Sequence, residues 1–492
     1  MSGKVCAHRP SLTALNSRVM LWSMFKPEVY KDRRAALLAT LRYQGIDSGY
    51  ALFPGNRDAP INYPDNCCRF RQDSSFLYFF GVAEPGLWAI LDIGSGKAVL
   101  YADELSENML VWTGPRPSPA DWVSLAGMDA AYPSAQLSAH MQAYARSKAP
   151  LLYLPPYRAD TRIELAEVLG LPLGGVEAGA SLPLIRAVIA LREIKSPLEL
   201  REISQAVDIS IAMHKAVIAA ARPGMSEAAL MAIATEIALS GGGATAFQPI
   251  ATTRGAVLHN HAYDARLGEQ GLFLLDAGAE TPEGYAGDLT STFAIAGAFD
   301  QRQAAIYDLV LKAGDAASAV LIPGRPYRDA HFAAAKAIAA GLKDLGLLRG
   351  DTDEAVEAGA HALFFPHGVG HQMGLDVHDM EALGEDHVGY GSLARSSQFG
   401  LRSLRMAKEV RPGMVLTVEP GIYFIEGLIK NWRAQGKFRE FIVYPELERW
   451  MDAGGYRNEE DWVITESGAS RLGGEFDKSA AAIESLRLNI RR

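Results

Sequence analysis

The chain has 492 residues, of which 49% are hydrophobic and 21% charged, an ordinary balance for a globular protein of two or three domains. Its formal net charge of −9 argues against a nucleic-acid partner or an anionic membrane surface. Three cysteines, Cys6, Cys67 and Cys68, make no disulfide framework, so we expect a reduced compartment, the cytoplasm. No uninterrupted apolar run approaches the roughly 18 residues of a membrane-spanning helix, and we expect no membrane partner.

Residues 1–23 are expected to be a flexible leader, because the first acidic residue is Glu28 and the apolar patch at 19–25 is too short for a secretory signal. A weak organellar transit peptide is the alternative. Residues 24–185 alternate strand-like and helical runs, which predicts a compact α/β domain. Residues 70–76, FRQDSSF, suggest the start of a polar strand in that domain.

A domain boundary is expected between residues 185 and 190, with a second domain over 190–492. Ser196 is a good N-cap, Pro197 suits the first helical position, and Glu199 favours the first turn of a long amphipathic helix. Further helices are predicted at 227–239, 303–322 and 327–345.

The stretch that points to chemistry is 271–293, GLFLLDAGAETPEGYAGDLTSTF, which predicts a β-hairpin. With a turn centred on Pro282, Asp276 and Asp288 would lie opposite each other, their Cβ atoms about 4.5–5.5 Å apart. Carboxylates that close repel each other unless a cation lies between them, and pairs of metal ions serve many hydrolytic enzymes. The alternative is a solvated turn flanked by two acids.

Residues 365–379, FPHGVGHQMGLDVHD, carry the histidines His367, His371 and His378. The first two have the spacing of a helical metal pair, but the intervening glycines disfavour a helix and the H-E-x-x-H pattern is absent. We expect a loop or bulged strand that brings one or two imidazoles to a site, with three structural histidines as the alternative.

Two strands near the C-terminus end in carboxylates. Glu419 follows the apolar run MVLTV, and Glu459 shares one strand face with Arg457. A carboxylate at the end of an apolar strand is costly unless it is paired or binds metal. Four carboxylates and one imidazole suit Mn²⁺, Co²⁺ or Zn²⁺ in a dinuclear site, whose candidate ligands are Asp276, Asp288, His371, Glu419 and Glu459.

These motifs, LLDAGAE…GYAGDLTSTF, HGVGHQMGLDVHD, VLTVEPGIY and RNEEDWVIT, resemble in order the ligand-bearing segments of the pita-bread metallopeptidases: methionyl aminopeptidase, aminopeptidase P and prolidase. The resemblance implies that the five candidates bind two divalent ions, manganese first and cobalt or zinc as alternatives. Residues 70–82 look like the N-terminal domain of the proline-specific branch. The implied fold is a two-domain α/β protein, a creatinase-like domain followed by an α+β pita-bread domain, in a homodimer or higher homo-oligomer.

The same resemblance implies roles for residues around the metals. His378 would donate a hydrogen bond to the developing oxyanion and Glu419 would shuttle a proton. His259 would position the substrate, and His367 and Arg457 match outer-shell or substrate-binding positions. Arg405 matches the prolidase arginine that binds the dipeptide carboxylate, the alternative being a local pair with Glu409.

The implied activity is Xaa-Pro aminopeptidase, acting on proline-containing peptides. Xaa-Pro dipeptidase is the alternative, and a pita-bread binding module without catalysis is a remote one. Three departures from the family stand out: twelve rather than eleven positions from Asp276 to Asp288, Phe247 where many relatives have tyrosine, and a long insertion between His378 and Glu419.

Overall fold

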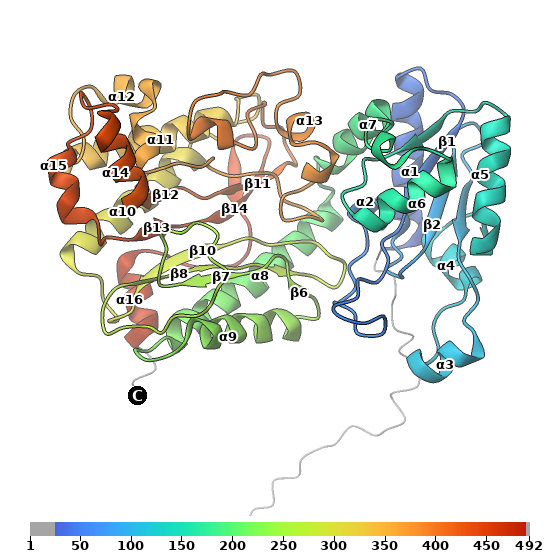
Figure 1. The fold of residues 1–492 in the computed structure, drawn as a ribbon, viewed down its shortest axis with the longest axis horizontal. Helices are drawn as coiled ribbons and strands as arrows, with labels where there is room; N and C mark the ends of the chain where they lie inside the picture. Colours follow the sequence, from blue (N-terminus) through green and yellow to red (C-terminus); the bar gives the residue numbers. More distant parts are fainter. Residues whose placement is uncertain (1–24, 489–492) are drawn as a thin grey trace, which may run out of the picture. The chain divides into compact units, whose positions relative to one another are not determined.

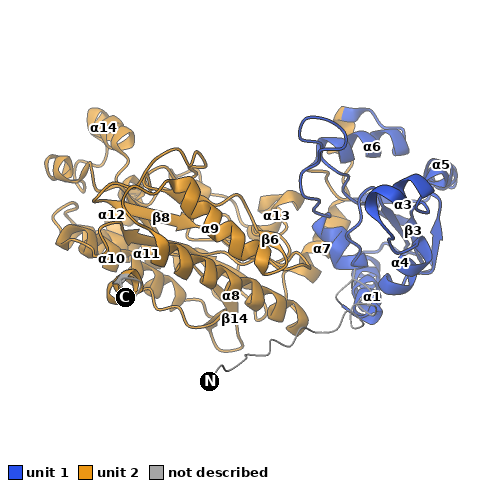
Figure 2. Ribbon diagram, turned by 90° about the horizontal axis from the view of Figure 1, so that it is seen from below, with its two compact units in different colours: residues 1–153, 158–173 blue, residues 154–157, 174–492 orange. Residues whose placement is uncertain are grey.

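The computed structural model describes residues 25–488, so the expected leader at 1–23 lies outside the described residues. The chain divides into two compact units (Figure 2). The first contains the described residues up to Tyr153 together with Arg158–Leu173, and the second contains Leu154–Tyr157 and everything from Gly174 onward. The division therefore falls before helix α7 (Leu182–Arg192), whereas the sequence placed it at 185–190.

The first unit is built on a five-stranded mixed sheet in the order β4-β3-β2-β1-β5 (Figure 1). Strands β1 and β2 and strands β2 and β3 pair antiparallel, while β1 with β5 and β3 with β4 are parallel. The strands are β1 (Tyr50–Pro54), β2 (Trp88–Asp92), β3 (Ala98–Tyr101), β4 (Ala130–Tyr132) and β5 (Leu151–Tyr153). The helices are α1 (Pro27–Tyr43), α2 (Ser74–Phe80), α3 (Glu107–Thr113), α4 (Pro119–Ala126), α5 (Leu137–Arg146) and α6 (Ala159–Leu169).

The segment 70–76 begins helix α2, so the expectation of a polar strand there is wrong. Asp73 is the N-cap, and its Oδ1 accepts a hydrogen bond from the Phe76 amide at 2.8 Å. Such a cap satisfies one of the amides that a helix start leaves without a partner. The helix stops at Gly81, whose left-handed φ of 67° favours glycine.

The second unit contains the longer helices and several small sheets. Its strands are β6 (Ala244–Thr245), β7 (Ile250–Thr252), β8 (Leu272–Asp276), β9 (Ala279–Glu280), β10 (Thr290–Ala294), β11 (Val415–Val418), β12 (Gly421–Tyr423), β13 (Gly455–Arg457), β14 (Glu460–Ile464) and β15 (Ala469–Arg471). Its main helices after α7 are α8 (Pro197–Ala220), α9 (Glu227–Ser240), α10 (Gln301–Ser318), α11 (Arg328–Asp344), α12 (Thr352–Ala358), α13 (Glu385–Gly389), α14 (Glu426–Gln435), α15 (Tyr444–Leu447) and α16 (Ala480–Leu488). The four helices expected in this part of the chain are thus present.

Two helix pairs flank the strands that carry the candidate ligands (Figure 1). Helices α8 and α9 lie beside β7, β8 and β10, and α10 and α11 lie on the other side, with α10 against β11, β12 and β13. The strands form two three-stranded sheets, β10-β8-β7 and β11-β14-β15. An isolated bridge between Thr290 and Glu459 joins the two halves beside the candidate metal ligands.

Helix α8 is a core helix of this unit. Ser196 and Glu199 form a reciprocal capping box at its start. Its buried His214 makes two contacts with the hairpin. Nδ1 lies 2.9 Å from Ser291 Oγ, and Nε2 lies 3.0 Å from the Ala277 carbonyl oxygen. The helix is long and apolar enough to meet a length-and-hydropathy criterion for a membrane span, but 50% of its most apolar window is buried in the fold.

The central hairpin forms, but its register differs from the expected one. Asp276 pairs with Thr290 and Glu280 with Ala286, so the turn is centred on Glu283 rather than on Pro282. The loop is closed by bonds from the Thr281 amide to the Tyr285 carbonyl and from the Gly284 amide to the Thr281 carbonyl. Moving the centre by one residue shifts the pairing by two, which keeps Asp276 and Asp288 on the same face but makes them diagonal neighbours.

We expect Gly287→Ala to destabilise the second unit by about 1–3 kcal/mol, the usual cost of overpacking. A Cβ at this position would lie 2.8 Å from the Val207 amide nitrogen of α8, and backbone atoms cannot move aside cheaply. Chemical denaturation measures the change. Gly427→Ala is the matched control, since a Cβ there meets no atom within 4 Å, and an equal loss in both variants would contradict the close approach of α8 to the hairpin.

Candidate metal centre

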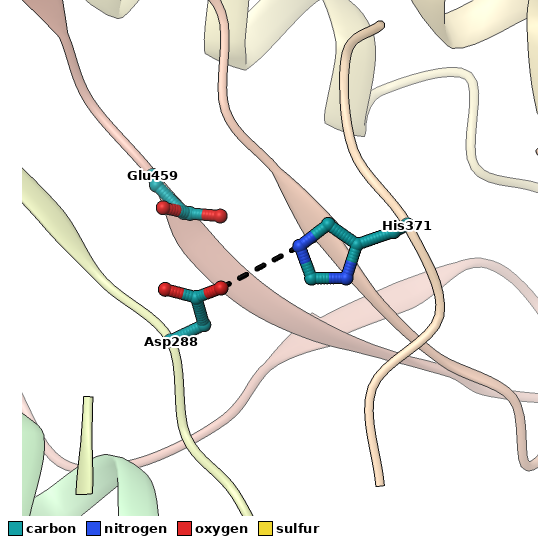
Figure 3. Close-up of side chains that lie close together, drawn as sticks. All are labelled: Asp288, His371 and Glu459. Atoms are coloured by element: carbon teal, nitrogen blue, oxygen red, sulfur yellow. Dashed lines mark ion pairs between the residues drawn. The ribbon is translucent and has the colours of Figure 1, made fainter. Parts of the chain in front are cut away.

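Three of the five expected ligands converge tightly. One ligand atom from each of Asp288, His371 and Glu459 lies within 4.8 Å of the others, and all three side chains are buried. Figure 3 shows them pointing toward one another from three separate chain segments, with His371 Nε2 3.5 Å from Asp288 Oδ2. Asp288 precedes β10, His371 lies in the glycine-rich loop, and Glu459 stands between β13 and β14.

Asp276 and Glu419 lie outside that tight group but line the same cavity, which we call the central cavity and which encloses about 570 Å³. Asp276 is at the end of β8, where its Oδ2 accepts from Arg457 Nη2 at 2.5 Å. Glu419 follows β11, and its amide donates to the Val369 carbonyl of the histidine loop. The cavity is also lined by every expected substrate-binding residue: His259, His367, His378, Arg405 and Arg457.

The protein by itself disfavours the ionised form of three carboxylates in the central cavity: Asp288, Glu419 and Glu459. Burial and the repulsion of Asp276 raise the pKa of Asp288 well above its usual range. Burial and Asp288 do the same to the pKa of Glu459, and burial with Glu459 raises the pKa of Glu419 to about 8. Bound cations would remove this repulsion, because they favour the ionised form of each carboxylate.

The donor set fits divalent metal ions. Oxygen-rich ligation with one imidazole is the preference of manganese and its neighbours. Asp288 Oδ1 is buried without a hydrogen-bond partner, as expected of an atom meant for a cation. His371 Nδ1 lies 3.0 Å from the Gln372 carbonyl, so we assign the proton to Nδ1, which leaves the Nε2 lone pair for a metal.

A second layer of residues that sequence analysis missed holds the ligands in place. Thr290 Oγ1 donates to Glu459 Oε2 at 2.8 Å, and Asp461 Oδ2 accepts from the Asp288 amide at 2.9 Å. Lys478 Nζ donates to the Thr290 and Glu459 carbonyls at 3.0 and 2.6 Å. Only Asp461 left a signal in the sequence, since it follows Glu459 by two positions and so falls on the same face of a predicted strand.

Arg457 belongs to this supporting layer by its contacts. Besides Asp276 it donates from Nη1 to the Tyr423 hydroxyl at 2.9 Å and from Nε to Thr290 Oγ1 at 3.2 Å. It is only 3% exposed, so its donors serve protein groups rather than open space. Tyr423 lies 2.9 Å from His367 Nε2, and His367 Nδ1 lies 2.7 Å from the Gly368 carbonyl, which occupies both ring nitrogens of that histidine.

His378 packs against the candidate ligand His371, with ring centroids 4.1 Å apart, and exposed His259 also lines the cavity. Burial and the nearby Arg457 lower the pKa of His259. Burial and His371 lower the pKa of His378 to about 4, while its Nδ1 lies 3.2 Å from Glu381 Oε2.

Arg405 does not pair with Glu409, the local acid named as an example of its alternative partner. Its Nη1 instead meets Glu381 Oε2 at 2.6 Å and Glu385 Oε2 at 3.4 Å, both supplied by the insertion after His378. Glu381 therefore joins His378 to Arg405, a connection that residue spacing could not reveal.

A buried cluster of carboxylates and one imidazole beside a cleft is the arrangement of a metal-dependent hydrolase. Residues 201–466 match metallopeptidase family M24, and residues 30–153 match the aminopeptidase P N-terminal domain. The chain belongs to metallopeptidase family M24 and is a metallopeptidase. The expected two-domain architecture, an aminopeptidase P N-terminal domain followed by a pita-bread domain, is confirmed.

Similar proteins agree with this assignment. The chain is 32% identical over 431 residues to the Xaa-Pro dipeptidase of Homo sapiens, covering 86% of this chain and 85% of that protein. It is 29% identical over 457 residues to a probable Xaa-Pro aminopeptidase of Metarhizium acridum, covering 87% and 88%. Among solved structures, Pseudomonas aeruginosa aminopeptidase PepP matches with a TM-score of 0.78 and 29% identity, covering 94% of this chain and 98% of that one. Zinc-substituted E. coli aminopeptidase P in complex with product also has a TM-score of 0.78, at 26% identity, with 96% and 100% covered.

We expect protein stripped of divalent metal by a chelator to lose stability as the pH rises from about 5 to about 8. Glu419 has a folded-state pKa of about 8 against an unfolded value of 4.5, so between these values the folded state binds the extra proton and rising pH favours unfolding. Added Mn²⁺ should raise the melting temperature more at the upper end of this range, since it binds ionised ligands.

Scanning calorimetry with and without chelator measures both effects. Glu419→Gln should weaken the pH dependence of the chelated protein, whereas Glu440→Gln, on the exposed surface, should leave it unchanged. A melting temperature that rises with pH in the chelated protein would contradict the repulsion between these carboxylates.

Proposed function

We propose that this metallopeptidase is an Xaa-Pro aminopeptidase, which releases the residue preceding proline from the N-terminus of peptides. Five ligands would hold two divalent ions: Asp276, Asp288, His371, Glu419 and Glu459. Manganese is the first candidate, ahead of cobalt and zinc. The names of the relatives support proline specificity but divide between dipeptidase and aminopeptidase.

The observation that favours long peptides is the pairing of Arg405. A dipeptidase needs a cationic group reserved for the free carboxylate of its substrate. The Arg405 guanidinium is already compensated by Glu381 and Glu385, so a dipeptide carboxylate would have to compete with two protein carboxylates. Xaa-Pro dipeptidase is the second candidate, because Arg405 still lines the central cavity and is 33% exposed.

Proline distinguishes the substrate because its nitrogen carries no hydrogen and its ring fixes φ. When bound, the metal pair supplies a nucleophilic water of lowered pKa and polarises the scissile carbonyl. Glu419 is placed at the cavity to carry a proton to the proline nitrogen as it leaves. Arg457 keeps Asp276 in position through their ion pair, and exposed His259, which lines the same cavity, orients the substrate.

His378 acts on the reacting carbonyl rather than on the metals. The contact with Glu381 uses Nδ1 and fixes the ring, which leaves Nε2 for the substrate. Donation to the developing oxyanion requires a proton on Nε2. Burial and His371 lower the pKa of His378 to about 4, and the Glu381 carboxylate opposes that lowering, so we propose that the ring takes up its second proton as negative charge develops on the carbonyl oxygen beside it.

We expect His378→Ala to keep its metal content and to lose roughly 10²–10³ in kcat, the scale of one oxyanion-hole donor. Elemental analysis and steady-state kinetics measure the two quantities. His371→Ala is the comparison, since it removes a proposed ligand and should lose metal. Equal metal loss in both variants would show that the two histidines have been assigned the wrong roles.

The test of the proposed activity compares an Ala-Pro dipeptide with an Ala-Pro-Ala tripeptide amide. The proposal expects efficient cleavage of the tripeptide amide, and it expects Arg405→Ala to change kcat/KM for that substrate little. Cleavage of the dipeptide alone, with a steep rise in its KM in Arg405→Ala, would establish the dipeptidase instead.

Two further properties belong to this proposal. We infer a cytoplasmic protein from its cysteine content and a homodimer or higher homo-oligomer from the family resemblance. Light scattering of the purified protein tests the second, and a monomer at micromolar concentration would overturn it.

A further inference from the structure

A second hollow adjoins the central cavity in the insertion between His378 and Glu419. It encloses about 600 Å³, within the usual range of ligand sites, and all of its lining residues fall between 384 and 405. Ser403 and Arg405 line both spaces, so the two hollows meet at these residues. We call the second space the side hollow.

The walls of the side hollow are tied together by Arg395. Its Nη2 pairs with Glu385 Oε1 at 2.5 Å and with Asp386 Oδ1 at 2.8 Å, both in α13. Its Nη1 donates to the carbonyls of Leu404 at 2.9 Å and Arg402 at 3.1 Å. One side chain thus clamps the short helix to the segment that carries Ser403 and Arg405, so the hollow has defined walls.

The side hollow is lined by three arginines and two carboxylates, and a third carboxylate, Glu381, pairs with Arg405 from outside the lining. Arg395 and Arg405 are paired with Glu385, Asp386 and Glu381. Arg402 has no carboxylate partner among residues 25–488; its guanidinium lies over the Phe399 ring, 5.5 Å from the centroid. Arg402 is exposed, so its charge can reach a ligand without protein rearrangement.

The two ends of a peptide substrate differ in length and charge. An aminopeptidase that removes one residue leaves nothing to extend beyond the cavity on the amino side, where the chain carries an ammonium group. The carboxyl side continues at about 3.3–3.6 Å per residue and can carry carboxylates. The exposed guanidinium of Arg402 repels the first end and attracts the second.

We propose that the side hollow binds the residues that follow proline, and that Arg402 pairs with a carboxylate there. The carboxylate is either the C-terminus of a short peptide or an acidic side chain of a longer one. Guanidinium and carboxylate can form two parallel hydrogen bonds, which gives geometric preference as well as charge. The inference rests on the proposed aminopeptidase activity, because a dipeptide has no residue to place in the side hollow.

The experiment uses two matched pairs of tetrapeptides with the metal-loaded enzyme. Ala-Pro-Ala-Ala as free acid and as amide tests the chain terminus, and Ala-Pro-Ala-Glu amide against Ala-Pro-Ala-Gln amide tests the acidic side chain. We expect KM to be about threefold to fivefold lower for the charged member of at least one pair, the scale of an exposed ion pair. Which pair shows the preference identifies the source of the carboxylate.

Arg402→Gln should abolish that preference while leaving kcat, and the KM of the uncharged peptides, unchanged. Arg433→Gln is the control, because Arg433 is an exposed arginine of α14 that lines neither hollow. Peptides that begin with proline resemble the product, and their inhibition constants repeat the comparison without turnover.

The possible outcomes test the carboxylate subsite and the aminopeptidase activity separately. Tetrapeptides cleaved with equal KM for charged and uncharged members overturn the subsite and leave the aminopeptidase activity standing. A preference that survives in Arg402→Gln also overturns it. Failure to cleave any tetrapeptide, with the dipeptide cleaved, overturns the proposed activity itself.

Discussion

The repulsion among carboxylates in one buried cavity is the constraint on which the rest of the second unit depends. Asp276, Asp288, Glu419 and Glu459 face a space where burial disfavours negative charge, and the Arg457 guanidinium contacts one of them, Asp276. In a metallopeptidase, the family to which the chain belongs, bound metal cations compensate such repulsion between carboxylates. The protein itself contributes dipoles and cations one step further out, where Lys478 bonds the carbonyls beside two of these carboxylates. Stability and catalysis are therefore opposed at this site: the same charges that bind metal weaken the protein without it.

Main-chain hydrogen bonds hold the candidate ligands in place despite this repulsion. Asp288 is tied by its amide to Asp461, Glu459 by the bridge to Thr290, and the histidine loop by its bonds to the strand before Glu419. Helix α8 approaches the hairpin so closely that Gly287 has no room for a side chain. A ligand held by main-chain bonds cannot relax away from its neighbours, which keeps the site organised for cations.

The insertion after His378 connects the chemistry to substrate length. Glu381 contacts both His378 and Arg405, so one carboxylate orients the group proposed to act on the carbonyl and compensates the cation at the edge of the cavity. In the proposed function, substrate selection and catalysis would share Glu381, which belongs to neither the candidate metal site nor the supporting layer. In the proposed subsite, the exposed guanidinium of Arg402 would meet the peptide residues that follow the proline.

The sequence by itself determined the parts that depend on local chemistry. Ser196, Pro197 and Glu199 start α8 where their capping preferences place it, and the alternation of the hairpin put Asp276 and Asp288 on one face even with the turn centre misplaced by one residue. Only the tertiary structure decided the register around Glu283, the choice of Glu381 over Glu409 by Arg405, and the support from Thr290 and Lys478. A cap or a pleat is set by neighbours within four residues, whereas a turn centre and a long-range ion pair are set by what the whole unit packs against them, which residue spacing does not encode.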